Sequence, residues 1–341
     1  MRILLRLLIV LLVIAAAVGG AFVWEKFNFE APGPAAANGA SETDVVIRQG
    51  VGLRGISAAL HDSGVIADPD LFLWGVRLRR TTALIKAGEY AIPSHASMHD
   101  ILDILIAGKS IQHKITAAEG LTSDMIAKLI NADAELAGPP VAAPAEGTLL
   151  PETYLFLRGA TRGQIIDRMI AAQKKLIARL WPRRDTNLPY HTVREAITLA
   201  SIVEKETSLP AERRHIAAIF VNRLRTGMKL QSDPTIIYSI TGGYPLGRGI
   251  RMSELSRVTP YNTYAVAGLT PTPICNPGTD AIAAVLNPGT TSDLYFVASG
   301  TGGHVFSASI ADQNRAVAAL RSRERIEKLK PPLPETTVPH L

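Results

Sequence analysis

The sequence is almost without cysteine: Cys275 is the only one among 341 residues. A single cysteine excludes an internal disulfide, so the fold must be held by its hydrophobic core. Nearly half of the residues are hydrophobic, which is enough for a sizeable core, and the length is enough for a membrane anchor and two domains. Cys275 lies in a proline-rich stretch and is interpreted as a small apolar residue of a loop.

Several functional motifs are also missing. The chain has no G-x-S-x-G turn, no S-x-x-K of the penicillin-binding type, no H-E-x-x-H and no Walker loop. His95 and His99 have a spacing that can hold zinc, but Ser97 and Asp100 fit a helix cap that would place His95 before the helix. We therefore expect neither a metal nor a cofactor. The net charge of +6 is spread along the chain without a basic and aromatic stripe, so nucleic acid is not an expected partner.

A long apolar run is present at the N-terminus. Arg2 and Arg6 precede it, it extends from Leu7 to Val23, and Trp24 closes it. About 18 residues are just enough to span a bilayer, and the positive flank predicts a cytoplasmic N-terminus with an exported body. A cleaved signal peptide is the alternative, because the run contains three consecutive alanines near a possible cleavage point. We favour an uncleaved anchor, since the apolar run continues past these alanines.

The pattern of elements beyond the anchor indicates an α+β protein. Residues 44–111 fit a strand, two helices, a second strand and a further helix with short spacers. The longer remainder is mostly helical, with a predicted hairpin around residues 294–306. The predicted organisation is a cytoplasmic N-terminus at 1–6, a transmembrane helix at 7–24, a flexible linker at 25–43, a small α+β module at 44–111, a larger mixed α+β domain at 112–330 and a disordered tail at 331–341.

Residues 192–207 carry the strongest functional pattern. Thr192 and Glu195 fit a capping box, and the positions after them are apolar on two stripes, so we expect a buried helix. The helix ends in two carboxylates, Glu204 and Glu206. A carboxyl group at the wall of an apolar cleft has a raised pKa and can act as a general acid near neutral pH, as in glycoside-cleaving enzymes.

The two glutamates are expected to differ. Helical side chains lean over the preceding turn, which places Glu206 over two large apolar residues, Ile202 and Val203, and Glu204 over smaller ones. Desolvation therefore favours Glu206 as the acid, with Glu204 as the second candidate. The alternative is that both are solvated residues of a last helical turn.

The chain resembles the endolytic murein transglycosylases of the MltG (YceG-like) family. The motifs occur in order from the anchor to about residue 320, and residues 132–145 match none of them. The motifs are E-G-L at 119–121, L-P-E-T-Y at 150–154, A-S-I-V-E-K-E-T at 200–207, F-V-N-R-L at 220–224, M-K-L-Q-S-D-P-T at 228–235, Y-N-T-Y at 261–264, G-L at 268–269, P-I at 273–274, N-P-G at 276–278, Y-F-V at 295–297 and G-G-H at 302–304.

The resemblance implies an enzyme of the inner membrane that works on nascent peptidoglycan. Members of the family cleave the β-1,4 bond between N-acetylmuramic acid and N-acetylglucosamine within glycan strands and leave a 1,6-anhydro end. The resemblance further implies a LysM-like module at 44–111, a catalytic domain at 112–330 and a catalytic glutamate at the second Glu of E-K-E, Glu206. The implied partners are glycan strands, the inner membrane and cell-wall synthases (penicillin-binding proteins).

Five polar residues after the glutamate helix are candidates for substrate binding: Gln231, Asp233, Tyr261, Asn262 and Tyr264. They offer hydrogen bonds and ring faces suited to amido sugars. Asp233, which precedes a proline, is equally typical of a turn, and Asn262 of a loop cap. Two other functions stay open. One is a hydrolase of the same bond, which would need a second carboxylate, and the other is a non-catalytic, membrane-tethered glycan-binding protein.

Overall fold

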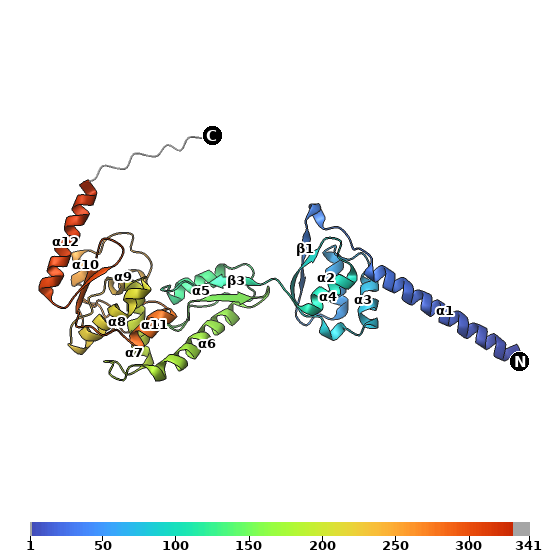
Figure 1. Ribbon diagram of the computed structural model, residues 1–341, viewed down its shortest axis with the longest axis horizontal. Coiled ribbons are helices and arrows are strands. Elements are labelled where there is room, and N and C mark those ends of the chain that lie inside the picture. Colours follow the sequence, from blue (N-terminus) through green and yellow to red (C-terminus); the bar gives the residue numbers. More distant parts are fainter. Residues whose placement is uncertain (1, 330–341) are drawn as a thin grey trace. The chain divides into compact units, whose positions relative to one another are not determined.

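The computed structural model describes residues 2–329, and the predicted tail at 331–341 lies outside them. The chain divides into two compact units (Figure 1). Unit 1 contains residues 2–115 and two short returning segments, 134–137 and 154–161, and unit 2 contains the other described residues from 116 onward. Both helices and strands are present, which confirms the predicted mixture of the two.

Unit 1 is built around an antiparallel pair of strands. β1 (Glu42–Ile47) pairs with β2 (Gly88–Pro93), and α2 (Leu53–Asp62) and α3 (Pro69–Leu78) lie between them in sequence. α4 (Met98–Ala107) follows, so the predicted strand–helix–helix–strand–helix order is confirmed. The unit also contains two 3₁₀ turns, η1 (Ala37–Gly39) and η2 (Thr82–Leu84), and most of the strand pair formed by β3 (His113–Thr116) and β4 (Thr153–Phe156).

The first helix is longer than predicted. α1 extends from Arg2 to Glu30, whereas the sequence pattern placed its end at Trp24 and a linker at 25–43. Residues Arg6–Glu30 are long enough and apolar enough to cross a membrane. The charged residues after Trp24 suggested an end because they break the apolar run, but they do not break the helix.

Contacts with α3 explain why the last turns of α1 are helical. Phe29 is fully buried and its ring lies 6.1 Å from that of Phe72. One turn earlier, Glu25 accepts a hydrogen bond of 2.7 Å from Nη1 of Arg79. Because Glu25 and Phe29 are four residues apart, they lie on one face of α1 and dock it against α3.

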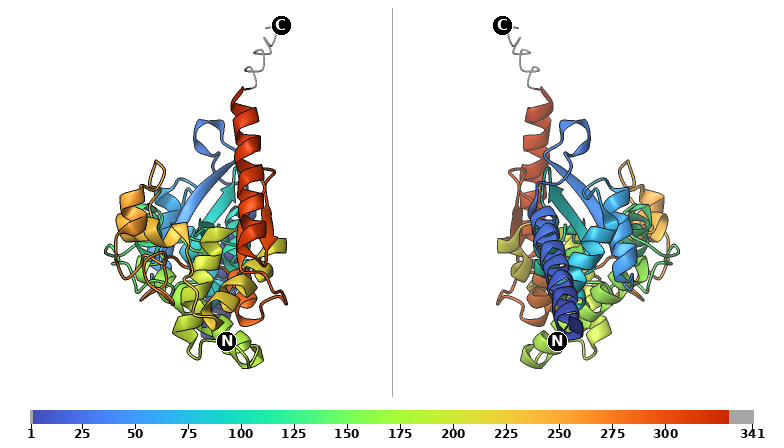
Figure 2. Two further views of the ribbon diagram at one scale, coloured as in Figure 1. Left: turned by 90° about the vertical axis from the view of Figure 1, so that its left-hand side faces the viewer. Right: turned by 90° about the vertical axis from the view of Figure 1, so that its right-hand side faces the viewer.

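Unit 2 is mainly helical. Near its end, β5 (Tyr295–Ala298) and β6 (His304–Ser307) form the predicted antiparallel hairpin. α12 (Ile310–Leu329) packs on this hairpin, and its last turns project from the unit (Figure 2). The other elements are α5 (Ser123–Ala132), α6 (Arg162–Leu180), η3 (Trp181–Arg183), α7 (Val193–Glu206), α8 (Pro210–Arg225), α9 (Asp233–Thr241), α10 (Met252–Ser256) and α11 (Thr279–Leu286).

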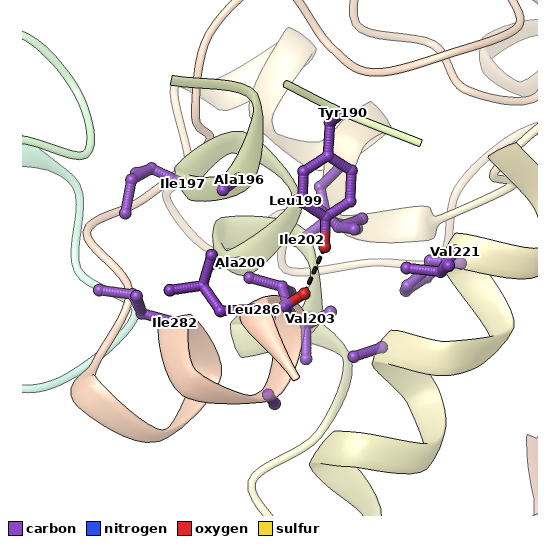
Figure 3. Close-up of a cluster of buried hydrophobic side chains, with 14 of the residues drawn as sticks. Tyr190, Ala196, Ile197, Leu199, Ala200, Ile202, Val203, Val221, Ile282 and Leu286 are labelled. Atoms are coloured by element: carbon purple, nitrogen blue, oxygen red, sulfur yellow. Dashed lines mark hydrogen bonds between the residues drawn. The ribbon is translucent and has the colours of Figure 1, made fainter. Parts of the chain in front are cut away.

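The helix α7 lies in the core of unit 2. It begins with the predicted capping box of Thr192 and Glu195, and every residue from Ala196 to Val203 is buried, as its two apolar stripes predicted. α8 and α11 pack against it. Figure 3 shows the apolar side chains of these helices gathered around α7. The Tyr190 hydroxyl donates a hydrogen bond to the Val285 carbonyl.

Two short helices differ from the sequence interpretation. A turn at Asp233 was one of the alternatives left open by the sequence, and Asp233 and Pro234 instead form the first turn of α9, where proline is tolerated because its missing N–H would have no partner. α10 was not predicted. It has no apolar periodicity, and it is held by polar contacts such as the hydrogen bond of 2.8 Å from the Arg251 N–H to Glu254.

Candidate active site

Glu206 is the last residue of α7 and is half-buried. Its Oε1 accepts a hydrogen bond of 2.5 Å from the Ser232 hydroxyl. Burial raises the pKa of Glu206 to about 7, and the charge of Asp233 adds to the rise, while the Ser232 hydrogen bond and the charges of His304 and Arg223 oppose it. A carboxyl group with this pKa is partly protonated at neutral pH, so it can donate a proton and later accept one.

Ser232 is held in place by buried hydroxyl groups. It is 1% exposed, its N–H donates to Oγ1 of Thr263 at 2.9 Å, and its carbonyl accepts from Oγ1 of Thr235 at 2.7 Å. The two threonine hydroxyls lie 2.9 Å apart. These hydrogen bonds connect the segments 231–235 and 261–264. They fix the backbone of Ser232, so its hydroxyl is held where it can donate to Glu206.

Glu204 has different partners. Its Oε2 accepts from the Gly278 N–H at 2.9 Å, and its Oε1 lies 3.5 Å from Nη2 of Arg213. Arg213 also lies 3.5 Å from Glu119 and 3.3 Å from Asp280. Burial raises the pKa of Glu204, and the Gly278 hydrogen bond opposes that rise. Since both oxygens of Glu204 have protein partners, its contacts favour a structural role.

Three of the predicted substrate residues lie next to the contact between Glu206 and Ser232. Gln231 and Asp233 flank Ser232 in sequence, and both are exposed. The half-buried Tyr264 donates a hydrogen bond of 2.6 Å to Oδ1 of Asp233. Burial raises the pKa of Tyr264, and its hydrogen bond to Asp233 adds to the rise, so this phenol is a donor at neutral pH.

The other two predicted substrate residues are more enclosed. Asn262 is 2% exposed, and its Oδ1 accepts from the Tyr264 N–H at 2.9 Å. Its Nδ2 donates to the backbone carbonyls of Glu254 and Leu255 in α10 and of Arg257 just after it, so the contacts favour a capping role for Asn262. Tyr261 is half-buried, and its hydroxyl lies 2.7 Å from Oγ1 of Thr272.

A buried asparagine joins two of the sequence motifs to the segment just before a third. Asn276 is fully buried, and its Oδ1 accepts from the Leu149 N–H at 3.0 Å. Its Nδ2 donates to Oε1 of Glu146 at 3.1 Å, and its backbone N–H donates to the Leu121 carbonyl at 2.9 Å. The segments around residues 121, 146–149 and 276–278 therefore meet at one point, which explains why they carry polar residues without being exposed.

The loop that carries Asn276 is also fastened to α7. Ser201 accepts a hydrogen bond of 2.9 Å from the Ile274 N–H. Cys275 is fully buried in this loop, and its Sγ lies 3.4 Å from the Ser201 carbonyl, which confirms the interpretation of Cys275 as a small buried loop residue. Together with the contact between Glu204 and Gly278, these bonds fix the loop along the last two turns of α7.

The sequence profile of the YceG-like family matches residues 45–319. The chain belongs to the YceG-like family. An endolytic murein transglycosylase of Bacillus subtilis is 29% identical over 331 residues, which cover 88% of this chain and 89% of that protein. One of Streptococcus pneumoniae is 30% identical over 334 residues, which cover 84% of this chain and 59% of that protein. A crystal structure of a YceG-like protein from Listeria monocytogenes is 29% identical, with coverage of 80% of this chain and 98% of that one and a TM-score of 0.49.

Three residues of the family motifs, to which no role was assigned from the sequence, interact with Glu206: Ser232 through a hydrogen bond, and Arg223 and His304 through their charges. Arg223 is 5% exposed and carries one of the charges that lower the pKa of Glu206. Nδ1 of His304 lies 2.7 Å from Oε2 of Glu212. Their presence in the motifs M-K-L-Q-S-D-P-T, F-V-N-R-L and G-G-H was the available signal, but only the fold shows that the three motifs converge on Glu206.

Proposed function

We propose that this YceG-like protein is an endolytic lytic transglycosylase of peptidoglycan. It cleaves the β-1,4 bond between N-acetylmuramic acid and N-acetylglucosamine within nascent glycan strands, leaves 1,6-anhydro ends and thereby limits glycan elongation. The names of the Bacillus and Streptococcus relatives support the substrate class. The observation that carries the chemistry is the Glu206 carboxyl, which has a pKa of about 7 and is held by Ser232.

In the proposed reaction, Glu206 acts first as an acid and then as a base. The protonated carboxyl donates its proton to the glycosidic oxygen as the bond from that oxygen to the anomeric carbon breaks. The carboxylate then accepts the proton of the 6-hydroxyl of the same N-acetylmuramic acid, whose oxygen bonds to the anomeric carbon. Glu206 ends protonated and no water is consumed, so one carboxyl group is sufficient.

The contact with Ser232 supports this assignment of roles. Because the Ser232 hydroxyl donates to Oε1, Oε2 is the atom left to carry the transferable proton. Among the residues that the structure describes, Oε2 of Glu206 has no hydrogen-bond partner, whereas in Glu204 one oxygen accepts a hydrogen bond from Gly278 and the other forms an ion pair with Arg213. Glu206 is therefore the proposed catalytic residue.

The substrate-binding part of the proposal rests on exposure. Gln231 and Asp233 are exposed beside the catalytic carboxyl, and Tyr264 and Tyr261 are half-buried with hydroxyls that can turn to a sugar. These groups can bind the acetamido and hydroxyl groups of the two sugars. Asn262, with its amide bonded to carbonyls of α10 and of Arg257, supports this part of the chain rather than offering a free donor.

The proposed setting is the inner membrane. α1 provides a span, and Arg2 and Arg6 before the apolar run favour a cytoplasmic N-terminus with both units outside the membrane. Unit 1, with its strand–helix–helix–strand core, is proposed as a LysM-like glycan-binding module, and cell-wall synthases are proposed as partners. A reporter fused to the C-terminus should be active only if exported, and activity in the cytoplasm would contradict this topology.

A hydrolase is the second candidate, and one observation favours it. Asp233 is near enough to Glu206 for its charge to raise the pKa of that group, so a second carboxylate is present at the site. The products separate the two reactions. Intact sacculi digested with the protein should release fragments that end in 1,6-anhydro-N-acetylmuramic acid, read by mass spectrometry. Reducing ends would instead establish hydrolysis, and no release at all would favour a binding protein.

A further inference from the structure

Exposed apolar and basic side chains gather at the end of α3 and in the turn after it. Leu78 and Leu84 are 52% and 53% exposed. The basic residues Arg77, Arg80 and Lys86 of the same segment are also exposed. The sequence contains no acidic residue between positions 70 and 89, so no opposite charge of this segment neutralises them. We call residues 77–86 the basic turn.

The packing of α3 on α1 fixes which end of α3 faces the apolar run. Phe72, near the start of α3, contacts Phe29, near the end of α1. Arg79, just after α3, contacts Glu25, which is one turn earlier in α1. The two helices are therefore antiparallel, and the chain approaches the apolar run of α1 as it leaves α3. Figure 1 shows α3 beside the C-terminal end of α1.

Close contact makes this arrangement specific. A side chain added at Gly75 of α3 would have its Cβ 2.3 Å from the Phe29 ring and 2.9 Å from Glu25. The Arg79 guanidinium also stacks on Phe29, 4.0 Å from the ring centroid. Glycine at position 75 thus allows the backbone of α3 to lie directly against α1, so α3 follows α1 wherever that helix is placed.

The level of the basic turn along α1 follows from helix geometry. Glu25, the partner of Arg79, comes directly after Trp24, which closes the apolar run. A helix rises about 1.5 Å per residue, so Arg79 lies within a few ångströms of the end of that run. The headgroup region extends about 5–7 Å beyond the hydrocarbon on each side of a bilayer. If α1 spans the membrane, Arg79 and the adjacent residues of the basic turn lie at headgroup level.

We propose that the basic turn is a membrane-contact surface on the bilayer that α1 crosses. Leu78 and Leu84 enter the interface, and Arg77, Arg80 and Lys86 bind anionic lipid headgroups. Apolar and basic residues in one exposed segment have the chemistry of interfacial binding. This inference rests on the proposed membrane anchoring by α1. Its consequence is that α1 and the basic turn both attach unit 1 to the membrane, which restricts rotation of the unit about α1.

A spin label tests the contact in the full-length protein reconstituted in vesicles. Cys275 is replaced with Ala, and a nitroxide is attached to a single cysteine in L84C. A control label in L155C reports a comparably exposed leucine on β4 of unit 1 that is far in sequence from the basic turn, since Leu155 is 51% exposed. A third label in V13C, within the apolar run, reports the span itself.

In vesicles that contain phosphatidylglycerol, the label at position 84 should lose accessibility to a water-soluble nickel chelate severalfold and gain accessibility to oxygen. The label at position 155 should stay open to the chelate. The double variant R80Q/K86Q should weaken the protection at position 84, by about fivefold for each charge removed. It leaves Arg79 unchanged, because Arg79 binds Glu25 inside the protein.

The outcomes distinguish a failure of the membrane-contact surface from a failure of the anchoring by α1. If position 84 is as open to the chelate as position 155 while position 13 is embedded in lipid, the anchor stands and the membrane-contact surface is wrong. If position 13 is open to the chelate, the anchoring itself is wrong. If position 84 is protected but the double variant changes nothing, binding to anionic headgroups is overturned.

Discussion

Glu204 and Glu206 are two residues apart at the end of one helix, and they have opposite surroundings. Burial raises the pKa of both. Glu204 is bonded through both oxygens to Gly278 and Arg213, whereas Glu206 is bonded through one oxygen to Ser232. The comparison teaches that a raised pKa does not by itself distinguish a catalytic carboxyl from a structural one. The distinction lies in whether an oxygen is left for the substrate.

The largest expected effect comes from Glu206→Gln. The substitution keeps size and hydrogen bonding with Ser232 but cannot donate a proton, so formation of anhydro products should fall by about 10²–10⁴-fold or more. Thermal melting should show a folded protein. Full activity of this variant would disprove the proposed mechanism.

Glu204→Gln is the matched control on the same helix. It keeps an acceptor for the Gly278 N–H but removes the charge that faces Arg213, so we expect a loss of unfolding free energy of about 1–3 kcal/mol. Activity should stay within about tenfold of the wild type, a smaller loss than removal of a catalytic group causes. Denaturant titration and product assays give both numbers. If Glu204→Gln is inactive while Glu206→Gln is active, the two roles are exchanged.

The pH dependence should reflect the raised pKa of Glu206. The reaction starts from the protonated acid, so kcat/KM should fall as pH rises through about 7. This pKa lies above the ordinary value of 4.5, so the folded state binds the proton more tightly than the unfolded state does. The resulting stabilisation is complete below about 4.5 and is lost as pH rises to about 7.

The same linkage gives a measurement that needs no substrate. Glu206→Gln removes a half-buried carboxylate whose charge destabilises the folded wild type at pH 8, so the variant should melt a few degrees higher there. The difference in melting temperature between the two proteins should shrink toward pH 4.5, where the side chain at position 206 is neutral in both folded proteins. An equal gap at both pH values would show that Glu206 titrates as an ordinary surface carboxyl.

Ser232→Ala should shift the pH profile without removing activity. The hydrogen bond from Ser232 stabilises the charged form of Glu206, so its loss should raise the pKa of Glu206. The alkaline limb of the kcat/KM profile should then shift by about one unit to higher pH. Ser232→Thr keeps the hydroxyl and should restore much of the wild-type limb. If the rate falls but the alkaline limb stays at the same pH, Ser232 contributes only to packing and does not set the pKa of Glu206.

Asp233→Asn should cause the smallest shift, and in the opposite direction. Removing the charge of Asp233 lowers the pKa of Glu206, so the alkaline limb should move down by about half a pH unit or less. KM should rise if Asp233 binds sugar. A loss as large as that of Glu206→Gln would instead mark Asp233 as the second carboxylate of a hydrolase.

Local patterns predicted most of the elements and the character of α7. Its capping box and apolar stripes depend on residues three and four apart, so the sequence shows a buried helix ending in two carboxylates. Predictions were less accurate where long-range contacts set the structure. α1 continues past Trp24 because Glu25 and Phe29 dock on α3, and no spacing within α1 contains that information.

For the candidate site, the sequence by itself determined the helix, the pair of glutamates and the preference for Glu206, because desolvation by the preceding helical turn is a local effect. Only the tertiary structure decided the partners of those glutamates. Ser232 comes 26 positions after Glu206, and Gly278 comes 74 positions after Glu204. A hydrogen bond needs two groups within about 3 Å, and only the packing of α7 against later loops brings such distant residues that close.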